Sequence, residues 1–452
     1  MNTSAVTYRT IWRWHFYAGL FSIPFILWLS VTGSIYLFRP QIERWLDRPY
    51  DHLVLKGVRA TPEAQALTAV AAVPGSHFHY YELPRTDHSA SQIVVGRDAK
   101  ELRVYVHPET LQVLKIVDED KRPMNVLFYL HGELLLGNRG SNIVELAASW
   151  AIVLLVTGVY LWWPRQSERL AGVLYVRLGR GSRIFWRDLH AVTGIWISAY
   201  ALFILLTGLP WANFWGGYLA KARTFAASHL VHQDWGTGKS FEIAQREARD
   251  ANSMAGMQMG PVPGVARPLQ HESGYAALNK LVPESLGFHL DPPVQIAPPD
   301  QPGGPWTVHS DTQDRPRRTT LSLDPMTGAI VKREPFSQLP LLDRIVDTGV
   351  AMHEGQLFGL ANQLIGLTAA MGLVTLSLSA IVLWWRRRQI GALGAPIPLG
   401  KPRWSFTLVV IIVVLAIYLP AMAISLSAVI LLEKFLFSRI PSVSRWLGLN
   451  PA

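Results

Sequence analysis

The sequence predicts an α-helical integral membrane protein: a duplicated four-helix bundle core with a fifth C-terminal span and two α+β modules outside the membrane. Half of the 452 residues are hydrophobic and only 16% are charged. Five apolar runs, at about 16–38, 143–163, 190–211, 364–385 and 405–432, match the roughly 20 residues that cross a bilayer as a helix. Two of these runs belong to a unit that occurs twice, which indicates an internal duplication.

The repeated unit begins with a histidine and ends with a tryptophan pair. The first copy runs from HGELLLG at His131 to Trp162–Trp163, and the second runs from HEGQLFG at His353 to Trp384–Trp385. In both copies the tryptophans follow the histidine by 31 and 32 residues. Tryptophan pairs close to arginine are typical of a helix end at the membrane–water interface.

The first and third runs also match each other. Each carries a histidine, a glycine four residues later, and a Thr-Gly pair further on: His15, Gly19 and Thr32–Gly33 in one, His190, Gly194 and Thr207–Gly208 in the other. Helices one and two therefore correspond to helices three and four. A parallel duplication of this kind predicts a four-helix bundle with a pseudo-two-fold axis along the membrane normal.

The net charge of +10 is concentrated in three short segments. Residues 1–14, 164–188 and 386–404 together carry thirteen lysines and arginines against two acidic residues. Because positive loops stay in the cytoplasm, the N-terminus and both loops are expected there. We find no reason to invoke nucleic-acid binding, since the basic residues lie where membrane topology requires them.

The resulting organisation divides the chain into ten segments. They are the N-terminus with span one (1–38), a first outside module (39–125), the second span unit (126–163), a basic loop (164–188), span three (189–211), a second outside module (212–350), the fourth span unit (351–385), a second loop (386–404), span five (405–436) and a tail (437–452). Pro420 predicts that span five is either kinked or a tight hairpin.

The sequence predicts that each outside module is a small α+β structure. In the first module we expect a helix at Thr61–Ala72, capped by Thr61, and strands at 92–95, 102–106 and 113–117. In the second we expect strands at 306–309, 319–323 and 329–332. The turns His107-Pro-Glu-Thr and Asp324-Pro-Met-Thr occupy equivalent positions before the next span.

Composition excludes several kinds of chemistry. The chain has no cysteine, which rules out iron–sulfur clusters, cysteine-attached haem, disulfides and thiolate catalysis. No Rossmann fingerprint follows a predicted strand, so no nucleotide-binding domain is expected. No convincing acid–base pair is present, and we assign no catalytic residue.

Four histidines form the candidate site. Topology places His15 and His190 near the cytoplasmic face, and His131 and His353 near the opposite face. The pseudo-two-fold brings equivalent positions together, so each level offers the two facing imidazoles that bis-histidine haem requires. Intramembrane ionisable groups are also functional candidates by default.

Small residues accompany these histidines. Gly19 and Gly194 lie one helical turn from theirs, on the same face, where a flat macrocycle could approach the backbone. For the Thr-Gly pairs, haem clearance and plain helix packing are equally good interpretations.

Two further groups invite ligand roles. His229 and His232 share a helical face and could replace an outer haem ligand or form a substrate or metal site, although solvated loop histidines are the favoured interpretation. Met254, Met257 and Met259 suggest copper, because thioethers are soft ligands, but a flexible loop is again favoured.

At these residues the sequence resembles the PepSY-associated transmembrane family, which includes the PiuB-type iron-regulated membrane proteins and the FoxB-type ferric-siderophore reductases. The features that carry the resemblance are WRWHFYAGL with Thr32–Gly33, HGELLLG, HEGQLFG, FWRDLHAVTG, the tryptophan pairs and the paired outside modules. The resemblance covers nearly the whole chain up to Arg388.

The resemblance implies a bacterial inner-membrane enzyme with two b-type haems, ligated by His15, His190, His131 and His353. Such a protein would pass electrons across the bilayer to a ferric siderophore, or another ferric chelate, held against periplasmic modules. Reduction weakens the bonds between iron and hard oxygen donors, so one electron can release the metal. The donor would be separate: a flavoprotein, a reduced flavin or a membrane quinol.

A rival function is non-redox. PepSY modules are also regarded as peptide-binding or protease-regulating units, so the chain could be a membrane-anchored binding protein. That alternative explains the outside modules but leaves four symmetry-related histidines without a role.

Overall fold

The computed structural model describes residues 3–164, 170–226, 243, 246, 274–299, 303–400 and 406–449. The chain divides into two compact units, each assembled from stretches that are distant in the sequence. The helical unit comprises Met1–Ile35, Leu130–Gly238 and Leu364–Ala452, and the sheet unit comprises Tyr36–Tyr129 and Lys239–Gln363. Both halves of the sequence therefore contribute to both units.

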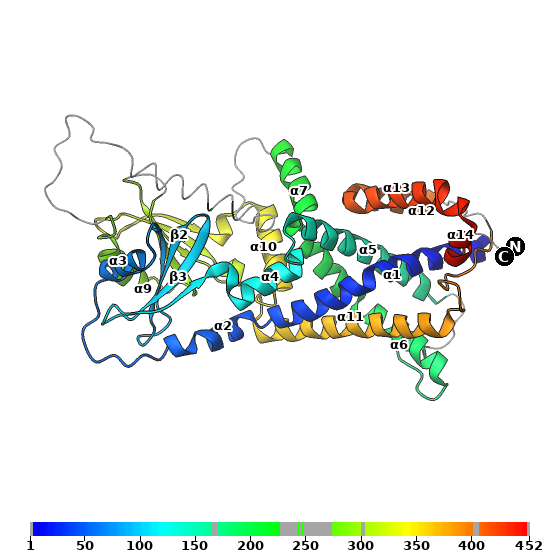
Figure 1. Cartoon of the computed structure of the whole chain (residues 1–452), viewed down its shortest axis with the longest axis horizontal. Coiled ribbons are helices and arrows are strands. Elements are labelled where there is room, and N and C mark those ends of the chain that lie inside the picture. Colours follow the sequence, from blue (N-terminus) through cyan, green and yellow to red (C-terminus); the bar gives the residue numbers. More distant parts are fainter. Residues whose placement is uncertain are drawn as a thin grey trace. The chain divides into compact units, whose positions relative to one another are not determined.

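Four long helices run lengthwise through the helical unit (Figure 1). They are α1 (Thr3–Tyr36), α5 (Asn138–Trp162), α6 (Ser182–Gly208) and α11 (Leu360–Arg387). In the described residues, five helices are long and apolar enough to cross a membrane, and these four are among them. The chain is thus a helical membrane protein, and its first four predicted spans are confirmed as helices. The shorter α7 (Asn213–Ala226) follows α6.

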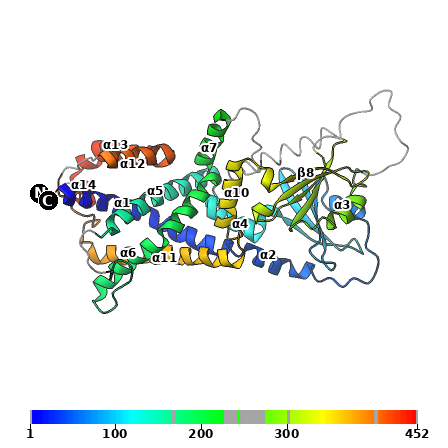
Figure 2. The same cartoon turned by 180° about the vertical axis from the view of Figure 1, so that it is seen from behind.

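The fifth predicted span is broken in two. α12 (Phe406–Tyr418) ends one residue before α13 (Pro420–Phe435), since proline has no N–H to continue the helical hydrogen-bond pattern. The two helices lie side by side in opposite views (Figures 1 and 2). Of the two arrangements that Pro420 predicted, the structure contains the tight hairpin, and α13 supplies the fifth candidate span.

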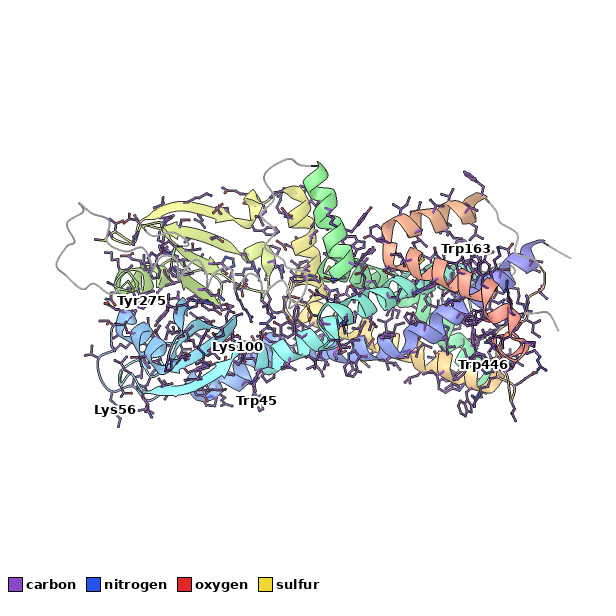
Figure 3. All side chains as sticks on the ribbon, turned by 45° about the horizontal axis from the view of Figure 1, so that its top comes forward. Trp45, Lys56, Lys100, Trp163, Tyr275 and Trp446 are labelled. Carbon is purple, nitrogen blue, oxygen red and sulfur yellow. The ribbon has the colours of Figure 1, made fainter. Side chains whose placement is uncertain are left out.

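The hairpin leads into α14 (Pro441–Leu447), which lies against the beginning of α1. The Arg13 guanidinium donates to the carbonyl oxygen of Gly448 at 2.9 Å, and the Tyr17 hydroxyl donates to that of Leu447. Trp163 and Trp446 project from the same end of the unit, as expected for an interfacial region (Figure 3).

The sheet unit contains one antiparallel sheet of eight strands in the order β4-β3-β2-β1-β5-β6-β7-β8. The strands are β1 (His77–Glu82), β2 (Ser91–Arg97), β3 (Lys100–Val106), β4 (Val113–Asp118), β5 (Val294–Ala297), β6 (Trp306–Ser310), β7 (Thr319–Leu323) and β8 (Ile330–Pro335). Each run of four strands follows a helix, α3 (Pro62–Ala72) or α9 (Leu278–Leu286). The two runs join where Tyr81 of β1 faces Ile296 of β5.

The hydrophobic core of the sheet unit lies between the sheet and the two helices. Fully buried residues include Ala66 and Ala69 of α3, Leu278 and Leu281 of α9, and Ile296 at the centre of the sheet. The helices also contact each other. The side chain of Asn279 accepts from the Glu63 backbone N–H at 3.1 Å and donates to the Glu63 carboxylate at 2.8 Å.

Local sequence signals predicted much of this unit. Thr61 caps α3 by accepting from the Ala64 backbone N–H at 3.3 Å, as expected. The six predicted strands all correspond to observed strands, with ends that differ by a few residues. β1 and β5, which join the two runs, were not predicted. The helices α2 (Arg39–Asp47), α4 (Pro123–Glu133), α9 and α10 (Leu341–His353) were also not predicted.

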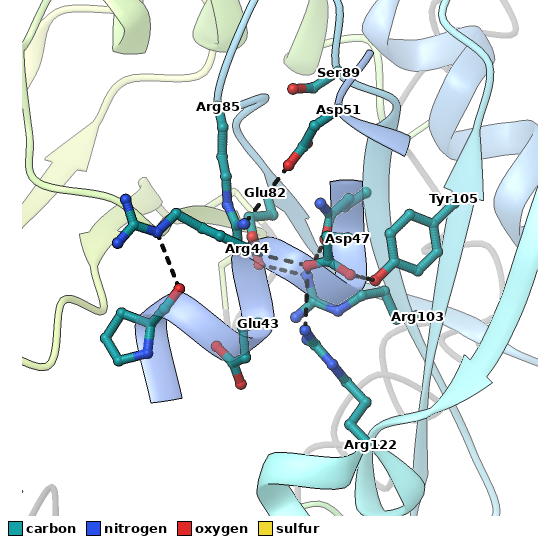
Figure 4. A network of polar contacts seen from close by, with 12 residues as sticks. Glu43, Arg44, Asp47, Asp51, Glu82, Arg85, Ser89, Arg103, Tyr105 and Arg122 are labelled. Atoms are coloured by element: carbon teal, nitrogen blue, oxygen red, sulfur yellow. Dashed lines mark hydrogen bonds and ion pairs between the residues drawn. The ribbon is translucent and has the colours of Figure 1, made fainter. Parts of the chain in front are cut away.

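A buried charge network occupies the first half of the sheet unit (Figure 4). The Arg103 guanidinium donates to Glu82 at 2.6 Å and Gln92 at 2.7 Å, and it also contacts Glu119. Burial alone would lower the pKa of Arg103, but Glu119 and Glu82 raise it well above its usual value. The carboxylates of Glu82 and Glu119 pair with the buried Arg103 guanidinium, which makes its burial tolerable.

Candidate functional site

The helical unit brings His15 of α1 and His190 of α6 together. Their ring centres are 6.4 Å apart and their planes are inclined by 82°. The sequence analysis paired these two residues because they occupy equivalent positions in the duplicated helices. Both residues are partly buried.

A hydroxyl group of α5 orients His15. Thr157 Oγ1 lies 2.9 Å from His15 Nδ1, and it donates its own proton to the Val153 carbonyl oxygen at 2.7 Å. Because that proton is committed, the hydroxyl must accept from the imidazole. His15 therefore carries its proton on Nδ1, and the lone pair on Nε2 is available to a metal.

The same arrangement holds His190 against α11. Its Nδ1 lies 3.1 Å from the Leu376 carbonyl oxygen and 3.2 Å from Ser379 Oγ. A carbonyl oxygen can only accept, so Nδ1 of His190 is again the protonated nitrogen. Thr157 and Ser379 are equivalent, since each precedes its tryptophan pair by five residues.

The three glycines near these histidines fall into two kinds. A Cβ added at Gly158, the residue after Thr157, would come within 3.2 Å of His15 Cε1. By contrast, a Cβ at Gly19 or Gly194 would make an ordinary contact, 3.7 Å to Leu154 Cδ2 or 3.5 Å to its equivalent Leu376 Cδ2. Gly158 thus makes room for an imidazole, whereas space remains beside Gly19 and Gly194.

The geometry of the His15–His190 pair fits a metal held between two imidazoles. Two metal–nitrogen bonds of about 2 Å each, together with the ring radii, put imidazole centres about 6.3 Å apart. Metal-ligating histidines also almost always donate their second ring N–H to an oxygen acceptor, as both histidines do here. The donor set of two neutral imidazoles matches six-coordinate haem.

His131 has a partner of the same type. Its Nδ1 lies 2.8 Å from Thr32 Oγ1, which donates to the Trp28 carbonyl oxygen at 2.9 Å. The Thr32 hydroxyl must therefore accept from His131. A Cβ added at Gly33 would come within 3.1 Å of His131 Cε1. The Thr32–Gly33 pair thus orients and accommodates an imidazole, a role that neither sequence interpretation included.

His131 and His353 begin the repeated units but lie outside the long helices α5 and α11. His131 lies in the last turn of α4, and His353 is the last residue of α10. Gly137 and Gly359 separate them from α5 and α11, and both adopt a positive φ that favours glycine. In both copies, the glycine that follows the histidine by six residues therefore marks a break between a short helix and a long one.

The structure brings together only part of the predicted set. His15 and His190 meet, and His131 meets Thr32, whereas His353 belongs to the sheet unit and His131 to the helical unit. His229, His232, Met254, Met257 and Met259 lie outside the described residues.

A second histidine pair lies on β1. The Nε2 atoms of His77 and His79 are 3.0 Å apart, and His79 Nδ1 lies 3.1 Å from Glu101 Oε1. Within the described part of the chain, no cluster of three or more histidine and acidic side chains could hold a metal ion. This pair is therefore not assigned a metal.

The sequence analysis missed the hydroxyl partners. Thr157 and Ser379 carry no chemistry of their own that would single them out. A signal did exist, because Val-Thr-Gly or Leu-Thr-Gly recurs at 31–33, 156–158, 192–194 and 206–208. Two of those threonines, Thr32 and Thr157, each bind the Nδ1 of a histidine on a neighbouring helix.

The family described as PepSY-associated TM region matches residues 12–387. The chain belongs to this family. The match includes His15, His131, His190 and His353 and ends at the last residue of α11, so the α12–α13 hairpin lies beyond it. A comparison with curated proteins finds no significant match.

Proposed function

We propose that this PepSY-associated membrane protein is a di-haem b oxidoreductase that carries electrons across the bacterial inner membrane to ferric iron in the periplasm. The observation that carries the proposal is the His15–His190 pair, with ring centres 6.4 Å apart and both Nδ1 atoms bonded to oxygen acceptors. Haem with two axial imidazoles supplies one-electron transfer without an open coordination position.

The chain's own contribution at this site is orientation. Thr157, Ser379 and the Leu376 carbonyl oxygen each contact an Nδ1 atom, which leaves the two Nε2 atoms as the nitrogens that would bind a metal. These acceptors also make the imidazoles more basic, which favours the oxidised state of a bound metal.

A second haem is proposed at His131 and His353, which stand at equivalent positions in the two copies. Support comes from Thr32, which orients His131 as Thr157 orients His15. Thr207 occupies the position equivalent to Thr32, and it already donates to the Phe203 carbonyl oxygen at 2.8 Å.

The positive-inside rule assigns direction to the pathway. Arg9 and Arg13 lie near the start of α1, and Arg386, Arg387 and Arg388 lie at or just after the end of α11. By the positive-inside rule, these arginines favour a cytoplasmic location for this end. The His15–His190 level is then the inner one, and the sheet unit lies in the periplasm. The proposed substrate is a ferric siderophore or another ferric chelate, and the electron donor is a separate molecule.

Optical spectroscopy tests the proposal. The purified protein should contain two b-type haems per chain and show a sharp α band on reduction. His15→Ala and His190→Ala should each remove about half of the haem, since each eliminates one axial ligand of the same group. His52→Ala, in an exposed loop, is the matched control.

Wild-type haem content in both histidine variants would contradict the inner assignment. A colourless wild-type protein, purified after haem-sufficient growth, would reject the redox function and favour the peptide-binding alternative. Oxidation of the reduced protein by a panel of ferric chelates would then identify the substrate class.

A further inference from the structure

Two arginines share one tryptophan ring at the end of the helical unit where α1 begins and α11 ends (Figure 1). The guanidinium carbon of Arg9 lies 5.1 Å from the centre of the Trp12 ring, and that of Arg387 lies 5.0 Å from it. Arg387 also lies 5.3 Å from the centre of the Phe16 ring. The indole therefore holds a guanidinium from each of two helices close together.

Neither guanidinium forms an ion pair with a carboxylate in the described part of the chain. Arg387 donates one hydrogen bond, from Nη2 to the Gly394 carbonyl oxygen at 3.0 Å, and Arg9 contacts the ring of Trp12. Two like charges beside one indole repel each other, and contacts with a neutral ring do not neutralise them. An anion placed between the two guanidiniums would do so.

Other arginines at this end have structural partners. Arg13 donates to the Gly448 carbonyl oxygen at 2.9 Å, and Arg386 donates to Ser182 Oγ at 2.6 Å. These two side chains connect segments of the helical unit. The positive-inside rule explains why this end is rich in arginine. It does not explain why Arg9 and Arg387 converge on one ring.

A ligand can reach this pair from outside the protein. Arg387 is exposed, and Arg9 and Trp12 are partly exposed. From Trp12, α1 continues through Phe16 and Leu20 at steps of four residues, which keep to one face of the helix. Leu20 is 38% exposed. At 1.5 Å per residue it lies about 12 Å further into the span than Trp12. The charged site therefore leads into an accessible apolar face.

A phosphate attached to a hydrocarbon chain complements both features. The forked donors of arginine match phosphate oxygens. A soluble anion would use the charges but not the apolar face, and a neutral hydrocarbon would use only the face. A phospholipid uses both, and its headgroup lies at the interfacial depth where tryptophan is common. A choline headgroup would add a positive charge beside the guanidiniums, so an anionic headgroup fits better.

We propose that Arg9, Trp12 and Arg387 bind the phosphate of an anionic phospholipid, whose acyl chain lies along Phe16 and Leu20. The phosphate bridges α1 and α11 by accepting from one guanidinium of each helix. This inference goes beyond the proposed function, because it requires neither haem nor iron.

Native mass spectrometry of the full chain in detergent, titrated with phosphatidylglycerol, tests the site. We expect one tightly bound lipid, and phosphatidylcholine should bind at least about ten-fold more weakly. Arg9→Gln combined with Arg387→Gln should weaken phosphatidylglycerol binding about 30-fold, at about five-fold for each arginine. Arg9→Lys combined with Arg387→Lys keeps both charges but loses the forked donors, so its effect should be smaller.

The matched control is Arg180→Gln combined with Arg183→Gln. It removes two exposed arginines just before and at the start of α6, and it changes the net charge by the same amount. It should bind phosphatidylglycerol as the wild type does. Undiminished binding by the Arg9 and Arg387 double glutamine variant would overturn the proposal. An equal loss in the control would also overturn it, since only the overall charge would then matter.

Two further measurements separate this site from other anion sites. An excess of inorganic phosphate should leave the lipid complex intact, and full displacement by phosphate would reject the lipid assignment. Haem content is measured on the same samples. A double glutamine variant that keeps the lipid but loses haem would reject this site and assign the arginines to haem propionates. A haem-free wild-type protein that binds the lipid would reject the oxidoreductase and leave this site standing.

Discussion

The two halves of the helical unit orient their histidines with different side chains at equivalent positions. In the first half, Thr157 bonds His15 at 2.9 Å and Gly158 leaves space for the ring. In the second half, Ser379 bonds His190 at 3.2 Å, the Leu376 carbonyl oxygen lies at 3.1 Å, and residue 380 is alanine. In both halves an oxygen atom accepts a hydrogen bond from the Nδ1 of the histidine. The halves differ in the residues that pack around the imidazole ring.

This difference has a physical cause. A threonine brings a methyl group as well as a hydroxyl, and its β-branched side chain has few rotamers, so it fixes its oxygen firmly. A serine has more freedom, and the His190 ring uses a backbone carbonyl oxygen in addition. The first half therefore depends more on one side chain than the second half does.

The largest expected difference between the halves comes from removing the hydroxyl groups. Thr157→Val should raise the midpoint potential of the inner haem and weaken its retention about 10–100-fold, as loss of a partner behind a metal ligand typically does. Ser379→Ala should have a smaller effect, because His190 keeps the Leu376 carbonyl oxygen. Potentiometric titration and haem transfer to an apo-globin acceptor measure the two quantities. Equal effects in both variants would refute the asymmetry.

A smaller effect is expected at the next residue. Gly158→Ala places a Cβ 3.2 Å from His15 Cε1, so the ring must move by a few tenths of an ångström, at a cost of about 1 kcal/mol. Ala380→Gly in the other half adds no atom and should cost only helix propensity, about 0.5–1 kcal/mol.

The electron paramagnetic resonance spectrum of the oxidised protein reports the orientation of the axial imidazoles. It should change in Gly158→Ala and stay unchanged in Ala380→Gly. An unchanged spectrum in Gly158→Ala would mean that the ring is not confined by this glycine.

The smallest effect is expected in the sheet unit, where the two equivalent turns use different acceptors. Asp324 Oδ1 accepts from the Thr327 and Met326 backbone N–H groups, and these bonds, led by that from Thr327, lower the pKa of Asp324. In the other turn His107 Nδ1 takes this place, accepting from Glu109 and Thr110.

A lowered carboxyl pKa stabilises the folded state above the unfolded value of about 3.9, and that contribution is lost as the pH falls through the folded pKa. The difference in thermal midpoint between wild type and Asp324→Asn should therefore shrink as the pH is lowered from about 6 to about 3. A difference that stays constant with pH would show that the charge of Asp324 contributes nothing.

Sequence reasoning succeeded where the signal was local or repeated. Thr61 with Pro62 predicted α3, and the duplicated spacing paired His15 with His190. It failed at β1, whose sequence HFHYYE places histidine and glutamate on a strand that the rest of the sheet buries. It also failed at Glu145, because no local pattern marks a helix cap that comes from a residue 69 positions earlier in the chain.

The central pairing of β1 with β5 has a consequence for biosynthesis. Tyr81 and Ile296 face each other across that pairing, although more than two hundred residues and two long helices separate them in the chain. While those residues are being translated, the edge of β1 that will pair with β5 has no partner strand. An unpaired strand edge promotes aggregation. The nascent chain must shield that edge until β5 has been translated and translocated.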